Sequence, residues 1–180
     1  MNPTDTDRQL DIVYRTVDSP IGLLLLAAGP EGLVRVAFDA EGHDAVLALL
    51  AERISPRILR SPGRLDDTAR QLDEYFAGRR RRFEVPVDLR LAGGFRRTVL
   101  LHLQRIPYGS TESYATVARA AGNPGAVRAV GSACSHNPVP LVVPCHRVVR
   151  SDGTIGQYLG GSEAKRALLA LEAAAGPAAS

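Results

Sequence analysis

The chain has 180 residues, of which 45% are hydrophobic, and this is enough for one domain of ordinary size or two small ones with a buried core. Lys and Arg outnumber Asp and Glu by 22 to 19, and the resulting charge of +3 permits nucleic-acid binding but is too small to identify it. The longest apolar run near the N-terminus, 21–28, is too short for a membrane span or a secretion signal, so we expect a cytoplasmic protein with free thiols at Cys134 and Cys145.

The first half of the chain is typical of a small sheet followed by helices. Three apolar runs separated by turn-forming residues predict an antiparallel meander. These strands are expected at 11–17, 22–28 and 32–38. Apolar residues at helical spacing over 43–53 and 65–76 predict two amphipathic helices that cover one face of the sheet. A linker near 91–94 then ends an N-terminal α/β domain, residues 1–91.

The second half is predicted to be mainly helical. Ser113 is an expected N-cap, and Asn123-Pro124 is an expected helix start, so two of the helices form a candidate helix-turn-helix. The helices are expected at about 95–106, 114–121, 123–136 and 162–173. We predict that residues 92–175 form a C-terminal domain and that 176–180 are a flexible tail.

The predicted helix 123–136 has two chemically different sides. Val127, Val130 and Cys134 recur at helical spacing and are expected in the core. The other sides carry small residues around one long cation, namely Ala126, Arg128, Ala129 and Ser132. We therefore interpret Cys134 as a structural residue.

Cys145 is the candidate nucleophile. A cysteine next to a histidine is a weak signal, so a buried structural role for Cys145 is an equally good interpretation of this pattern alone. It follows an apolar run, 141–143, that predicts a buried strand. A free thiol has a pKa of about 8.5 and needs a base, which His146 would supply. Neighbouring residues on a strand point in opposite directions, so the histidine would act through a water. Glu172 lies on an otherwise apolar side of the last helix, which indicates a buried partner such as that histidine.

We considered a metal site and do not expect one. Its donors would be Cys134, His136, Cys145 and His146, and their spacing does not bring four ligands together. We expect neither a metal nor a cofactor.

Several short motifs occur together in one order. They are Asp18-Ser19-Pro20-Ile21-Gly22, Pro107-Tyr108-Gly109, Ser113-Tyr114, Val127-Arg128-Ala129-Val130-Gly131, Asn137-Pro138, Pro144-Cys145-His146-Arg147-Val148, Gly156-Gln157-Tyr158-Leu159-Gly160-Gly161, and Lys165 with Leu168-Leu169-Ala170-Leu171-Glu172. Over nearly the whole chain they resemble the O6-alkylguanine-DNA alkyltransferases, the methylated-DNA–protein-cysteine methyltransferases.

The resemblance implies an α+β fold, with an N-terminal ribonuclease H-like antiparallel sheet and helices and a C-terminal winged-helix, helix-turn-helix type domain. It implies direct-reversal DNA repair, in which an alkyl group moves irreversibly from O6-alkylguanine to the protein's own cysteine. O4-alkylthymine is a further candidate substrate. The partner would be double-stranded DNA carrying the lesion, bound by a monomer, with cooperative assembly on DNA left open.

The resemblance also implies roles for individual residues. Cys145 would accept the alkyl group, His146 would activate it through water, and Glu172 would orient the histidine. Asn137 would brace the turn beneath the site, and Tyr114 would act on the target phosphate or the leaving oxygen.

Recognition of DNA would involve a second set of residues. Arg128 would replace the flipped nucleotide in the base stack. A narrow minor groove would accept the helix because its outer residues, Ala126, Ala129 and Ser132, are small. The base pocket would be formed by the 156–161 loop and by Val148, Tyr158, Leu159 and Lys165.

Two positions depart from the family pattern, Leu100 in place of Trp and Ser110 in place of an acidic residue. Neither belongs to the catalytic set. A competing interpretation is a lesion-binding module that transfers nothing, and the presence of Cys145 argues against it. A thiol hydrolase would need an oxyanion hole that the sequence does not identify.

Overall fold

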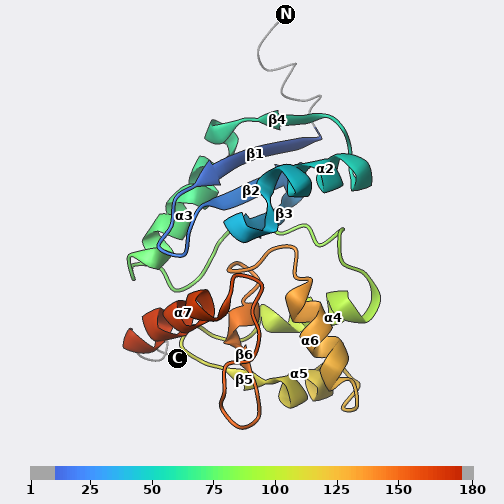
Figure 1. Ribbon diagram of the computed structural model, residues 1–180, viewed down its shortest axis with the longest axis vertical. Coiled ribbons are helices and arrows are strands. Elements are labelled where there is room, and N and C mark those ends of the chain that lie inside the picture. Colours follow the sequence, from blue (N-terminus) through green and yellow to red (C-terminus); the bar gives the residue numbers. More distant parts are fainter. Residues whose placement is uncertain (1–10, 176–180) are drawn as a thin grey trace, which may run out of the picture.

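The computed structural model describes residues 11–175, which form a sheet-containing unit and a mainly helical unit in contact with each other (Figure 1). The predicted tail, 176–180, lies outside the described residues. Among the residues described, no helix combines the length and hydrophobicity needed to cross a bilayer.

The predicted meander is confirmed. Strands β1 (Ile12–Val17), β2 (Leu24–Gly29) and β3 (Gly32–Phe38) pair antiparallel, with Thr16 opposite Leu25 and Leu26 opposite Val36. A fourth strand that we did not predict, β4 (Ile58–Arg60), pairs parallel with β1. Its three residues are too few to give a periodic signal.

Helices α2 (His43–Arg53) and α3 (Asp66–Phe76) lie within a residue of their predicted bounds. The expectation that both cover one face was wrong, because α2 packs with Leu25 on one face of the sheet and α3 packs with Leu24 and Leu26 on part of the other. Short 3-10 turns, η1 (Asp39–Glu41) and η2 (Pro62–Leu65), precede these helices. The rest of the second face packs against the helical unit, so that Val36 and Val139 belong to one core cluster. Both faces of the sheet are therefore buried.

The segment that leads into the predicted linker is fixed along the edge of the sheet. The Leu33 amide donates to the Pro86 carbonyl at 2.8 Å, and the Asp88 amide donates to the Leu33 carbonyl at 2.9 Å. Gly32 has φ +138°, and a Cβ there would lie 2.5 Å from the Pro86 oxygen, so only glycine fits. These contacts connect the end of the first unit to β3.

The second unit contains α4 (Gly94–Leu103), α5 (Tyr114–Ala120), α6 (Val127–Ser135) and α7 (Ser162–Ala174). Strand β5 (Glu112–Ser113) pairs parallel with β6 (Val148–Val149). The predicted N-cap is confirmed, because the Ser113 hydroxyl accepts from the Thr116 amide at 3.0 Å. Leu100, the departure in α4, is fully buried in the main core cluster.

Two sequence predictions about this unit were wrong. Helix α6 begins at Val127 rather than near Asn123, because the Ala126 amide closes a turn onto the Asn123 carbonyl at 3.0 Å. Val127 thus lies in the first helical turn and is 40% exposed, not buried as expected.

The second error concerns residues 141–143, which form a turn rather than a strand. The Val143 amide donates to the Val139 carbonyl at 2.9 Å, and Leu141 has φ 74°. Prolines at 138, 140 and 144 remove the amide donors that a strand would need. Cys145 consequently opens a 3-10 helix, η3 (Cys145–Arg147), instead of lying on an extended strand.

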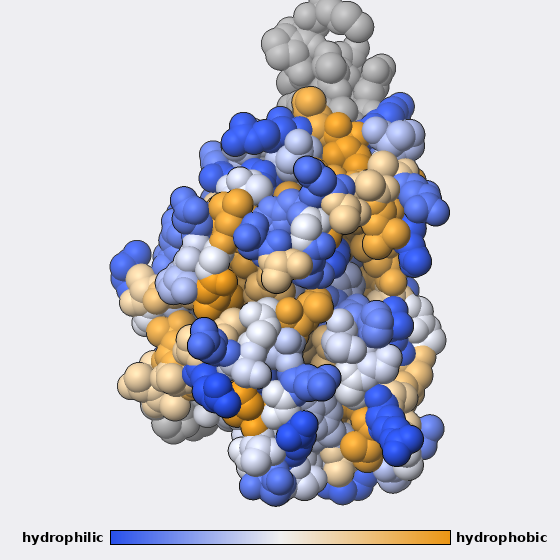
Figure 2. Space-filling view, viewed as in Figure 1, coloured by the Kyte–Doolittle hydropathy of each residue, from blue (hydrophilic) through white to orange (hydrophobic). Residues whose placement is uncertain are grey.

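Hydrophilic residues cover most of the face shown in Figure 2, and apolar residues appear there in separate patches. Such a distribution is ordinary for a protein surface. It gives no reason to place an extended apolar docking area on this face.

Candidate functional site

Cys145 lies at the start of η3, on a turn held by the side chain of Asn137. The Asn137 amide nitrogen donates to the Val143 carbonyl at 2.9 Å, and its oxygen accepts from the Val139 amide at 3.0 Å. Asn137 is itself buried, so these bonds replace the backbone pairing that the prolines prevent. The turn is thereby fixed from beneath.

The Cys145 thiol is 2% exposed, and burial raises its pKa to about 11. A hydrogen bond from Asn137 and the positive charge of Lys165 act in the opposite direction but do not overcome the effect of burial. At neutral pH the group is therefore a thiol, and it must lose a proton to act as a nucleophile.

His146 and Glu172 form a buried pair directly behind the cysteine. The histidine Nε2 lies 2.7 Å from the Glu172 Oε2, and both side chains are excluded from solvent. Burial disfavours the charged glutamate, but hydrogen bonds from His146 and Arg147 outweigh that penalty and lower its pKa to about 2. An ionised carboxylate only accepts, so Nε2 carries the proton of the neutral ring.

The other ring nitrogen of His146, Nδ1, is buried and has no hydrogen-bonding partner in the described protein. Burial lowers the pKa of this histidine in spite of the neighbouring carboxylate. The ring is therefore neutral near pH 7, with Nδ1 able to accept a proton.

Two further donors bind Glu172, and the sequence did not indicate either of them. Arg147 donates from Nε to Oε1 at 2.8 Å and from Nη2 to Oε2 at 3.1 Å. The Tyr75 hydroxyl donates to Oε2 at 2.6 Å. Tyr75 lies within the predicted amphipathic helix 65–76, but helical periodicity carries no information on where its hydroxyl points.

Cys145 lies in a cavity of about 410 Å³ between α6 and the 156–161 loop. Its wall includes Tyr114, Ser132 and Tyr158, and Cys134 also borders it. The cavity is lined by Tyr114, Val127, Gly131, Ser132, Cys134, Ser135, Cys145, Arg150, Gly156, Gln157 and Tyr158. A larger cavity of about 710 Å³ borders Pro144 and Arg147 but neither cysteine, so we place the site in the smaller one.

Tyr114 and Tyr158 are the two tyrosines that line this cavity. Burial raises the pKa of Tyr114 to about 12. A Cβ at Gly156 would lie 2.9 Å from the Tyr114 hydroxyl, so glycine is required where the loop crosses the ring. The Tyr158 hydroxyl is buried without a hydrogen-bonding partner in the described protein, and its ring lies 6.4 Å from that of His146 between centroids.

The remaining predicted pocket residues lie beneath the cavity rather than on its surface. The Lys165 ammonium donates to the Val148 carbonyl at 2.6 Å and to the Gln157 carbonyl at 3.3 Å. It thus fixes the 156–161 loop to β6. Leu159 packs against the main core cluster.

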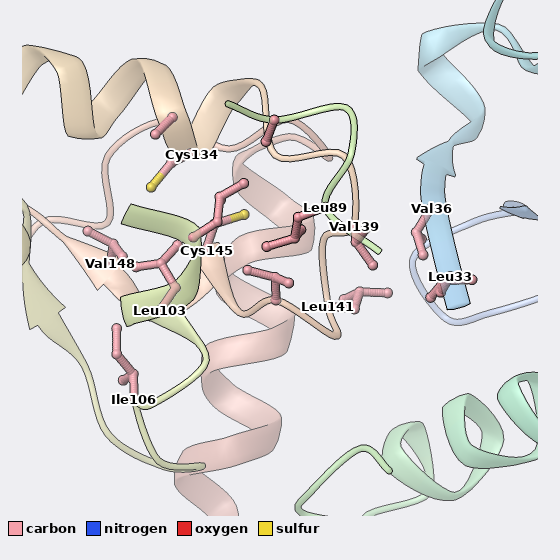
Figure 3. Packing of buried hydrophobic residues seen from close by; sticks show 14 of the residues in the cluster. Leu33, Val36, Leu89, Leu103, Ile106, Cys134, Val139, Leu141, Cys145 and Val148 are labelled. Carbon is pink, nitrogen blue, oxygen red and sulfur yellow. The ribbon is translucent and has the colours of Figure 1, made fainter. Parts of the chain in front are cut away.

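The predicted DNA-contacting residues share the outer side of α6. Arg128, Ala129 and Ser132 are exposed, and Ala126 is half-buried just before the helix. This helix also forms one wall of the cavity that holds Cys145. Figure 3 shows Cys134 of the same helix beside Cys145. A partner bound to α6 would therefore lie at the entrance of the site.

The sheet unit contacts the turn beneath Cys145 and the 156–161 loop that forms one wall of the cavity. The Val36 amide of β3 donates to the Pro138 carbonyl at 2.8 Å, and in Figure 3 Leu33 and Val36 face Val139 and Leu141. The ring of Phe38 packs edge-on against Tyr158 at 5.5 Å between centroids.

Within residues 11–175, no group of three or more His, Cys, Asp or Glu side chains is placed to hold a metal ion. The chemistry that this arrangement supports is nucleophilic attack by a single thiol with a neutral imidazole as base.

Two family models match the chain. Residues 12–89 match the ribonuclease-like domain of 6-O-methylguanine DNA methyltransferase, and residues 94–174 match its DNA binding domain. These matches agree with the predicted fold class of a ribonuclease-like sheet unit and a DNA-binding unit.

Curated relatives and solved structures give the same result. The methylated-DNA–protein-cysteine methyltransferase of Mycolicibacterium paratuberculosis is 42% identical, over 93% of this chain and 96% of the relative. The constitutive Bacillus subtilis enzyme of that name is 36% identical, over 88% of this chain and 94% of the relative.

Among solved structures, Mycobacterium tuberculosis O6-methylguanine methyltransferase superposes with a TM-score of 0.81 at 40% identity, covering 93% of this chain and 96% of the other. A complex of M. tuberculosis OGT with DNA superposes with a TM-score of 0.77 at 41% identity, covering 92% and 96%. The resemblance inferred from the motifs is thus confirmed, and the chain belongs to the O6-alkylguanine-DNA alkyltransferases, the methylated-DNA–protein-cysteine methyltransferases.

Proposed function

We propose that this protein repairs double-stranded DNA by transferring an alkyl group from O6 of guanine to its own Cys145, once per molecule. The observation that carries this proposal is the placement of a buried thiol in the cavity whose wall is α6, with a neutral His146 hydrogen-bonded to the ionised Glu172 behind it. An alkyl carbon inside a duplex is out of reach, so the nucleotide must first turn out into this cavity.

The proposed reaction forms one bond and breaks one. The Cys145 sulfur attacks the alkyl carbon, forming a carbon–sulfur bond, while the bond from that carbon to guanine O6 breaks. The thiol proton passes to His146 Nδ1 through a water, consistent with the buried, unpartnered state of that nitrogen. Guanine leaves with the bonding electrons and takes up a proton, assisted by a hydrogen bond from Tyr114. Because the product is a stable thioether, the reaction has no reverse route.

On the DNA side, Arg128 would fill the gap left by the flipped nucleotide, while Ala126, Ala129 and Ser132 allow α6 into the minor groove. Val148, Tyr158, Leu159 and Lys165 would position the base, with the Lys165 bonds holding the loop in place. We propose that a monomer binds the lesion, and that residues 1–91 and 92–175 act as the two domains.

Intact mass spectrometry tests the transfer directly. After incubation with a duplex carrying O6-methylguanine, we expect the mass of one methyl group per protein molecule, and peptide mapping should place it on Cys145. The Cys145→Ala variant should gain nothing. Tight lesion binding without any mass gain in the wild-type protein would replace this proposal with the non-transferring module.

Cys134→Ser should leave the transfer capacity at one methyl group per molecule. Cys134 borders the same cavity, but burial holds its pKa far above the usual range and no base is hydrogen-bonded to it, so it should not compete as acceptor. The same mass measurement checks this expectation. Loss of transfer in this variant, with folding intact, would show that Cys134 has more than a packing role.

A further inference from the structure

A tyrosine from the sheet unit reaches the carboxylate behind the active histidine. Tyr75 lies on α3, and its hydroxyl donates to Glu172 Oε2 at 2.6 Å, although the two residues are 97 positions apart. The same oxygen lies 2.7 Å from His146 Nε2. Arg147 Nη2 donates to it as well, at 3.1 Å, so three donors share this oxygen and only Tyr75 comes from the sheet unit.

The Tyr75 ring is held so that the hydroxyl cannot easily turn elsewhere. It is fully buried and packs against Phe76, Phe83 and Tyr108, with ring centroids 5.2 to 6.1 Å apart. Burial and the charge of Glu172 raise the pKa of this phenol far above its ordinary value. Tyr75 therefore keeps its proton and remains a donor over the pH range of the assay described below.

We propose that Tyr75 is a positioning residue for alkyl transfer, which acts by sharing Glu172 Oε2 with His146 and so keeps the imidazole neutral and correctly oriented. This inference rests on the proposed function of Cys145 and His146. A hydrogen bond donated to a carboxylate draws electron density from it. The carboxylate then stabilises an imidazolium less strongly, and the neutral base is favoured.

Several other titratable or charged groups surround the same pair and stay in place when only the Tyr75 hydroxyl is removed. Besides the tyrosine, the titratable and charged side chains that face His146 and Glu172 are Arg147 of η3, Lys165 of α7, and Tyr108 and Tyr158 from the connecting segments. Removal of one hydroxyl from the Tyr75 ring leaves all of these in place. Tyr75→Phe is therefore a clean variant.

The Tyr75→Phe variant should shift the acid limb of the pH profile of the transfer rate to higher pH. Without the shared donor, the pKa of His146 rises, so less neutral imidazole exists at low pH. If the rise is about one unit, the transfer rate below the midpoint should fall about tenfold, and above the midpoint it should stay close to wild type. The measurement is the single-turnover rate on an O6-methylguanine duplex at saturating protein, expressed as the ratio of variant to wild type from pH 5 to 9.

Tyr108→Phe is the matched control. The Tyr108 ring contacts Tyr75, but its hydroxyl donates to the Leu171 carbonyl at 3.4 Å and not to Glu172. Its rate ratio should be independent of pH. A flat ratio for Tyr75→Phe as well would mean that the hydroxyl has only a packing role, and the inference would fall.

A second variant tests the opposite direction and keeps the fold. Fluorotyrosine placed at position 75 alone is a more acidic donor, so it should move the acid limb to lower pH; a shift in the same direction as Phe would overturn the inference. ¹⁵N NMR titration of His146 reads the pKa without any transfer. If the wild-type protein transfers nothing, the proposed function fails, while an unchanged His146 pKa in Tyr75→Phe refutes only the role of Tyr75.

Discussion

Arg128→Ala should slow the repair of O6-methylguanine in duplex DNA about a hundredfold while leaving the reaction with the free alkylated base close to wild type. Arg128 is exposed at the first turn of α6, beside the cavity that holds Cys145. Extrusion of a nucleotide costs a few kcal/mol, and a side chain that fills the gap recovers part of that cost. A free base needs no extrusion, so the arginine should not affect it.

Single-turnover rates on the two substrates measure this difference. Arg53→Ala is a suitable control, because Arg53 is an exposed arginine at the end of α2, in the sheet unit rather than on α6. It removes the same charge and should change neither rate appreciably. Equal losses on duplex and free base in Arg128→Ala would refute the assignment of this residue to flipping.

Glu172→Gln should lower the free energy of unfolding by about 3 to 5 kcal/mol near neutral pH and strongly reduce transfer. The buried carboxylate accepts hydrogen bonds from Tyr75, His146 and Arg147. A neutral amide leaves the Arg147 charge uncompensated in the interior, and its NH2 group faces donors instead of acceptors. Urea denaturation and the mass assay give the two readouts.

The stability difference should depend on pH in a definite direction. The pKa of Glu172 falls from 4.5 to about 2 in the folded protein, so its ionisation contributes about 3 kcal/mol of stability that is present above about pH 4.5 and is lost as pH falls through 2. The gap between wild type and Glu172→Gln should therefore narrow as the pH is lowered from 5 to 2. A gap that stays constant over this range would show that the carboxylate does not carry this linkage.

Local patterns predicted much of the fold. The meander of β1, β2 and β3 was legible because turn residues separate its apolar runs, and Ser113 was legible as an N-cap from its side chain. The turn at 141–143 was not predicted, because its apolar run is typical of a buried strand. The signal against a strand was the three prolines at 138, 140 and 144, which lack the amide donors that a strand needs. The start of α6 depended on one backbone bond that no periodicity records.

The candidate site likewise contains residues that local sequence predicted and residues that it could not predict. The motif around Cys145, together with Glu172 on an apolar helical side, was enough to predict the buried His146–Glu172 pair. Tyr75 and Arg147 could not be assigned to that carboxylate, because their bonds depend on how two units and a 3-10 helix meet in space. Long-range side-chain geometry is the part that a single sequence does not encode in local spacing.

The Val36 amide in β3 donates to the Pro138 carbonyl. The shape of the turn that leads to Cys145 is therefore specified in part by a strand that lies outside the DNA-binding unit. Side chains alternate along a strand, so a one-residue slip of β3 would turn Val36 away from the turn and bring a residue of the opposite face toward it. Substitutions that shift this strand should therefore disturb the turn that carries Cys145 without changing any residue that lines its cavity. Natural variation in such a protein has to be judged over both halves of the chain, not only around the cysteine.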